Sequence, residues 1–191
     1  MIINSNIEIN NETLYLIQFE LVKNGNRLVL YTLMAYGDEE DRPIMDENKI
    51  IFFDAPEMAD IALSHADNNM KHLGPPPKEV ALVCNIPKTI HLVREGTIDP
   101  QSIILDCLNT LFDMINSLNL EVRDDYKKLL YPFADYLTFH HEFATYIDER
   151  EIDHAAIKDS INWCMAVIFS RSKYLSAKGW DEGLLTNNII N

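Results

Sequence analysis

The chain has 191 residues, a length typical of one globular domain, and its composition is 47% hydrophobic and 24% charged. Thirty acidic residues against 16 basic ones give a formal net charge of −14. A negative field of this size repels phosphate backbones and anionic lipid surfaces, so the sequence argues against nucleic acid and membrane partners. It favours a basic protein partner, although solubility alone also selects an acidic surface.

The cysteines predict a reducing compartment. Cys84, Cys107 and Cys164 are odd in number and widely separated, and none belongs to a C-x-x-C motif. We therefore expect reduced thiols and a cytoplasmic location. The N-terminal residues lack the basic and apolar regions of a signal peptide, and no segment approaches the ~18 apolar residues of a membrane span.

The first hundred residues favour strands. Two apolar runs, 14–22 and 27–36, flank Asn24-Gly25, and this arrangement predicts a β-hairpin because both turn residues tolerate a positive φ. A third strand is expected over 49–53, followed by a helix from Ala55 to about Leu73. Two further strands are expected, at 79–84 and, after Pro87, at 88–93.

The second half follows a helical spacing. Asp99 and Pro100 are expected to open a helix, with Asp106 and Asp113 on the face opposite its apolar stripe. A second helical stretch begins near Arg123, and Pro132 is expected to kink or break it. The last helix is expected to run from Ile152 to about Leu175.

These elements together predict an α+β fold. A mostly antiparallel sheet of four or five strands with one helix would occupy residues 1–98, and a cluster of three or four helices residues 99–175. Residues 176–191 would form a tail, docked either on the domain or on a partner. Because no linker separates the halves, we expect them to pack as one domain, with any site at the seam between them.

Two clusters of charged residues are candidate sites. The loop formed by Asp38, Glu39, Glu40 and Asp41 lacks the alternating spacing of a calcium loop, so it is either a solvated turn or a contact for a basic partner.

The second cluster is His140, His141, Glu142 and His154. A zinc-protease motif fails here because Thr145 stands where its second histidine belongs. We expect a polar helix face, and neither a metal nor a cofactor.

Three functions remain open. The first is a non-catalytic protein-interaction module, an adaptor or an immunity-type inhibitor of a basic partner, because the chain is small and acidic and carries no recognisable catalytic motif. The second is an enzyme or small-molecule binder whose site is assembled in the helical half. The third is a structural homo-oligomer. The sequence favours the first and leaves catalysis uncertain.

Overall fold

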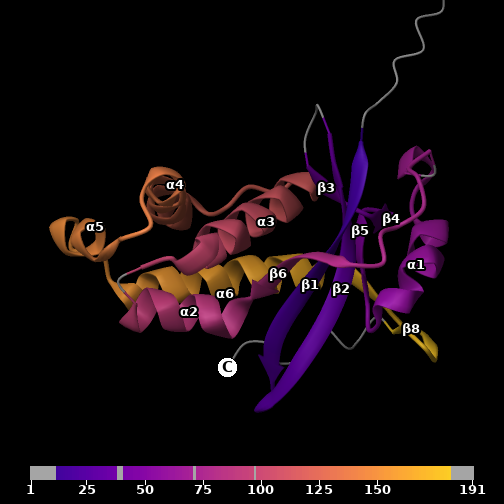
Figure 1. Ribbon diagram of the computed structural model, residues 1–191, viewed down its shortest axis with the longest axis horizontal. Coiled ribbons are helices and arrows are strands. Elements are labelled where there is room, and N and C mark those ends of the chain that lie inside the picture. Colours follow the sequence, from indigo (N-terminus) through magenta and orange to yellow (C-terminus); the bar gives the residue numbers. More distant parts are fainter. Residues whose placement is uncertain (1–11, 38–40, 71, 97, 182–191) are drawn as a thin grey trace, which may run out of the picture.

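The computed structural model describes residues 12–37, 41–70, 72–96 and 98–181. Within these ranges the chain forms six α-helices and one sheet of eight strands (Figure 1). The strands are β1 (Thr13–Lys23), β2 (Asn26–Tyr36), β3 (Arg42–Pro43), β4 (Met45–Asp46), β5 (Lys49–Phe53), β6 (Val80–Asn85), β7 (Ser172–Ser176) and β8 (Gly179–Asp181). The helices are α1 (Ala59–His65), α2 (Ile86–Glu95), α3 (Ile103–Ser117), α4 (Asp124–Phe139), α5 (Ala144–Glu149) and α6 (His154–Ser170).

The sheet confirms the α+β class and corrects its details. Its order is β6-β1-β2-β5-β7-β8, while β3 pairs with β2 and β4 with β5. Most pairs are antiparallel, but β1 with β6 and β5 with β7 are parallel. The sheet is therefore mixed and larger than the four or five strands expected. It also draws two of its strands from the C-terminal part of the chain.

The predicted hairpin is present as β1 and β2. Its eleven residue pairs run from Lys23 opposite Asn26 to Thr13 opposite Tyr36. The turn residues Asn24 and Gly25 have φ angles of 51° and 75°. Positive φ at both positions matches the right-handed twist of the flanking strands, which is why this dipeptide is favoured in two-residue hairpins.

Apolar cores cover both faces of the sheet. On one face, α1 packs against β5 and β2. On the other, α2, α3 and α6 pack against β1, β6 and β7, and α4 and α5 extend this layer outward (Figure 1). Successive strand residues point to opposite faces, so the N-terminal strands contribute side chains to both cores. In the larger core these side chains pack against side chains of the C-terminal helices.

The expected strand over 88–93 is wrong, because these residues belong to α2. Asn85 caps this helix by accepting a hydrogen bond from the Lys88 N–H at 2.9 Å, and a proline occupies its first turn. Ile86, Thr89 and Val93 form its buried face. A short apolar run is compatible with the spacing of a strand and with that of a helix. Here the cap and the helical spacing of the buried residues favour the helix.

The last helix also ends earlier than expected. α6 stops at Ser170, and the following residues form β7 parallel to β5, with β8 beside it. Trp180 of the expected tail lies on β8, where its ring contacts the His65 ring edge-on, with centroids 5.2 Å apart. Residues 182–191 lie outside the described part of the chain. The pairing of β7 with β5 joins residues far apart in sequence, so local periodicity did not reveal it.

Asp99 opens the helical region, as expected, but through a more complicated turn. Its buried carboxylate accepts hydrogen bonds from the N–H groups of Ile104 at 2.8 Å and Leu105 at 3.1 Å. Between Asp99 and the start of the helix, Gln101 and Ser102 adopt positive φ angles of 56° and 58°, so α3 begins at residue 103. The Asp99 N–H donates to the His141 carbonyl oxygen at 2.6 Å, which joins this turn to the segment between α4 and α5.

Replacing Asp99 by alanine should lower the free energy of unfolding by about 2 kcal/mol or more, because two buried N–H groups lose their acceptor. Asp153, the exposed cap of α6, is the matched control: it accepts from the Ala155 N–H at 2.8 Å. Asp153→Ala should cost about 1 kcal/mol, since water can replace that acceptor. Urea unfolding measures both. Equal losses would contradict the role given to Asp99.

Candidate functional site

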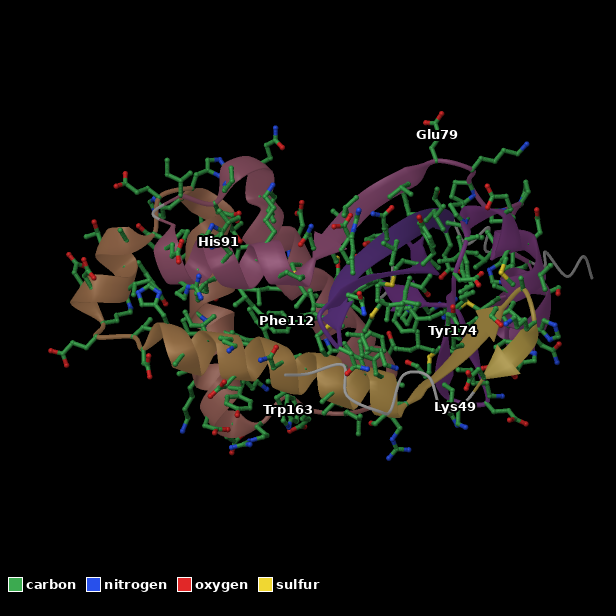
Figure 2. The ribbon with its side chains drawn as sticks, turned by 90° about the horizontal axis from the view of Figure 1, so that it is seen from below. Lys49, Glu79, His91, Phe112, Trp163 and Tyr174 are labelled. Atoms are coloured by element: carbon green, nitrogen blue, oxygen red, sulfur yellow. The ribbon has the colours of Figure 1, made fainter. Side chains whose placement is uncertain are left out.

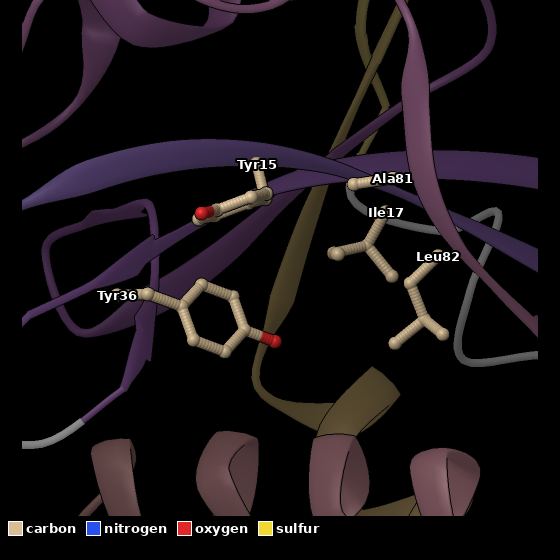
Figure 3. Close-up of a pocket in the computed structure, with 5 residues that line it drawn as sticks. All are labelled: Tyr15, Ile17, Tyr36, Ala81 and Leu82. Atoms are coloured by element: carbon tan, nitrogen blue, oxygen red, sulfur yellow. The ribbon is translucent and has the colours of Figure 1, made fainter. Parts of the chain in front are cut away.

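A groove of about 250 Å³ opens on the face of the sheet that α2, α3 and α6 cover. Its lining residues are Tyr15, Ile17, Tyr36, Ala81 and Leu82, and we call it the Tyr15–Tyr36 groove (Figure 3). The two tyrosine rings, from the two strands of the hairpin, meet edge-on at 5.0 Å between centroids. The lining is thus apolar apart from two phenol groups, and Tyr15 is 39% exposed.

A β-bulge shapes one side of the groove. Val80 pairs with Leu16 and Leu82 pairs with Ile17, so Ala81 is an extra residue between them. A bulge leaves its extra residue outside the ladder and bends the strand. As a consequence Leu82 turns toward the groove while Ala81 remains exposed at its margin.

The charges of three aspartates act on the Tyr36 phenol. Burial raises the pKa of the Tyr36 phenol to about 12, and the negative charges of Asp113, Asp41 and Asp106 add to this rise. Asp106 and Asp113 stand two turns apart on α3, and both are half-buried. The sequence placed them on the face opposite the apolar stripe, and in the structure α3 packs on β3 and on β6, the strand that carries Ala81 and Leu82 of the groove.

The carboxyl groups of Asp106 and Asp41 are partly buried. Burial raises the pKa of both Asp106 and Asp41, and the charge of Asp99 adds to the rise at Asp106. Carboxylates in such surroundings attract a cation more strongly than fully hydrated ones do, because the effective dielectric constant is lower. We call Asp41, Asp106 and Asp113 the acidic rim.

The predicted acidic loop is described only in part. Asp38, Glu39 and Glu40 lie outside the described residues, whereas Asp41 is half-buried and belongs to the acidic rim. The groove was not predicted. The sequence carried one signal of it. The alternation of the hairpin places Tyr15 and Tyr36 on the same face as the apolar residues Ile17 and Met34.

The expected polar helix face is wrong for His140, His141 and Glu142, because α4 ends at Phe139 and these residues lie between α4 and α5, whereas His154 begins α6. The His140 ring stacks on Tyr136, with centroids 4.5 Å apart, and His141 accepts the Asp99 N–H through its carbonyl oxygen. Glu142 forms an isolated bridge with Ile98, and His154 Nδ1 lies 2.6 Å from the Val93 carbonyl oxygen. In the ranges that the structure describes, no group of three or more His, Cys, Asp or Glu is arranged to hold a metal ion.

The three cysteines come together in the larger core, which their spacing did not reveal. Cys84 of β6, Cys107 of α3 and Cys164 of α6 are free and buried. A hydrogen bond with Cys107, together with burial, raises the pKa of the Cys84 thiol, and burial raises that of Cys164 to about 12. Such thiols remain protonated at neutral pH and are poor nucleophiles.

Comparisons with known proteins inform the fold alone. No known protein family matches the chain, and no curated protein matches it in sequence. The chain is similar in structure to the C-terminal domain of SatS, solved in complex with bromine, with a TM-score of 0.53 and 12% identity. The alignment covers 84% of this chain and 93% of that one, so the likeness extends over most of the α+β architecture.

Among the described residues, the helices are all too short or too polar to cross a membrane.

Asp113→Asn should lower the pKa of Tyr36 from about 12 while leaving it above the ordinary value of 10, because burial is the larger cause of the rise. Titration followed by tyrosinate absorbance measures this, and Tyr36→Phe assigns the signal. The pKa of Tyr36 is higher in the folded chain than the value of 10 expected for the unfolded chain. The free energy of unfolding therefore falls because of Tyr36 only as pH rises from 10 to about 12. An unchanged midpoint would place Asp113 away from the phenol.

The native protein should not react with a thiol reagent such as Ellman's, because Cys84, Cys107 and Cys164 are buried. All three should react once denaturant is added. Ala166→Cys on the exposed side of α6 provides a positive control that reacts in the native state. Rapid reaction of a native thiol would contradict this burial.

Proposed function

We propose that the protein is a non-catalytic, cytoplasmic protein-interaction module that binds a basic segment of its partner at the Tyr15–Tyr36 groove. The observation that supports this proposal is the apolar groove with the acidic rim beside it. An adaptor, or an immunity-type inhibitor of a basic protein, would use such a surface. The ligand that complements it is a peptide with apolar side chains flanked by lysine or arginine.

The size of the groove supports a side chain as its occupant. At about 250 Å³ it is smaller than the ~300–1,000 Å³ that pockets for small molecules usually have. An aliphatic or aromatic side chain would bury the exposed part of Tyr15 and the margin at Ala81. The acidic rim would then provide the long-range attraction, together with the charge of −14 on the chain.

The same charge argues against the homo-oligomer as the main function. A symmetric contact through the groove would bring two acidic rims together, and the repulsion would oppose it. The enzyme alternative would need a reactive group at the groove or in the helical region. Tyr36 is protonated at neutral pH, the His140 ring stacks on Tyr136, and His154 Nδ1 lies 2.6 Å from the Val93 carbonyl oxygen, which supports structural roles for these side chains.

Binding of a labelled peptide tests the proposal. The probe is a peptide of about nine residues composed of Lys and Leu, and its counterpart carries Glu in place of Lys; fluorescence anisotropy reports both. We expect the Lys peptide to bind at low salt, to weaken about tenfold as ionic strength rises, and to bind far better than the Glu peptide.

A pair of charge-matched variants separates the groove from the overall charge. Asp106→Asn with Asp113→Asn removes two charges from the acidic rim, and Asp148→Asn with Asp159→Asn removes two exposed charges elsewhere. The first variant should weaken binding of the Lys peptide at least about fivefold, and the second should change it little. Equal effects of both variants, or equal binding of the Glu peptide, would contradict the proposal.

A further inference from the structure

The β6 strand forms one end of the sheet. Among the described strands it pairs with β1 alone, so no strand in the described part of the chain covers its outer edge. Figure 2 shows the segment from Glu79 into β6 along the margin of the molecule. The side chains agree with this position, because Ala81 is exposed and Val83 is 43% exposed.

The two ends of the sheet differ in how they are protected. The opposite end is β8, which has only three residues and includes the acidic Asp181. β6 has six residues, Val-Ala-Leu-Val-Cys-Asn, without a charge or a proline. Proteins usually blunt an exposed edge with charges, prolines or very short strands. The bulge at Ala81 affects only the start of β6, and the pairing with β1 is regular from Leu82 to Asn85.

We infer that the partner segment binds by adding a β-strand to the outer edge of β6 and placing an apolar side chain in the Tyr15–Tyr36 groove. This inference rests on the proposed function and specifies its binding mode. Strand addition to an open edge is a recurring way of binding an extended peptide, in which the backbone supplies affinity and alternate side chains supply specificity.

The geometry of β6 assigns the side chains of the added strand. Leu82 faces the groove, and Val83 points to the other face of the sheet. A residue paired beside Leu82 therefore points toward the groove, and its neighbours in the chain point to the opposite face. On the groove side α3 packs on β6, and its aspartates Asp106 and Asp113 favour lysine or arginine beside the apolar residue of the segment.

The occupant is thus an extended basic segment of another protein. A second copy of this chain is the competing occupant, and its charge of −14 disfavours it at an edge next to the acidic rim. Sedimentation of the chain alone distinguishes the two. A dimer that Ala81→Phe dissociates would overturn the inference in favour of self-association.

Hydrogen exchange of the full chain with and without the Lys/Leu peptide locates the bound strand. We use the version in which Lys and Leu alternate. The amides of 80–85 should become protected, while those of β8, the other end of the sheet, should not change. Protection confined to another surface would overturn the inference.

Two N-methylated peptides separate strand addition from binding by charge alone. In a β-strand, the N–H groups of alternate residues point to the same edge, so methyl groups on one alternating set block one edge only. One methylated peptide should lose about tenfold or more in affinity because it loses several backbone hydrogen bonds, and the other should bind nearly as the parent does. If both bind as the parent does, strand addition fails while the proposed function stands. If the parent peptide does not bind, both fail.

Ala81→Phe tests the groove in the protein. Ala81 is exposed, so the substitution fills the margin of the groove without disturbing the core. Ala166→Phe, on the exposed side of α6, is the matched control. The first variant should bind the peptide at least about fivefold more weakly, and the second should bind normally. Unchanged binding by Ala81→Phe would remove the groove from the binding site.

Discussion

The burial of β5 on both faces is the constraint on which the rest of the structure depends. Four consecutive residues, Ile50 to Phe53, are fully buried, and they alternate between the two cores. Phe52 contacts Phe19 and Phe169 at ring-centroid distances of 5.5 Å and 5.2 Å, which joins β5 to β1 and α6. Full burial of each such side chain contributes about 1.5–3 kcal/mol. Layers are therefore required on both sides, and they are supplied by α1 and by the C-terminal helices.

The position of the groove follows from this arrangement. Because β7 returns from the end of α6 to pair with β5, the C-terminal strands complete one side of the sheet. The other side ends at β6, whose chain continues directly into α2. α3 then packs across β6 and β3, and the charges of its half-buried Asp106 and Asp113 act on Tyr36. The groove, the open edge and the acidic rim are thus consequences of one packing arrangement.

The site was predictable only in outline. Asp41 belonged to the acidic loop proposed from sequence, and it lies near the groove, whereas Asp106 and Asp113 were expected opposite the apolar stripe. Helical periodicity predicts an apolar and a polar face of a helix, but it does not predict whether another element packs beside the polar face. The meeting of Cys84, Cys107 and Cys164 was likewise invisible, because it joins residues from β6, α3 and α6 that no local pattern relates.

By itself, the sequence determined the α+β class, the hairpin at Asn24-Gly25 and the negative charge, because turn chemistry, alternation and composition act over a few residues or over the whole chain. The tertiary structure alone decided the parallel strands and the end of α6 before β7. Each of these depends on a partner strand distant in the chain, whereas the helical state of residues 88–93 follows from a local cap at Asn85 that the apolar run obscured. The groove depends on the same long-range pairing, so it became visible only in the folded chain.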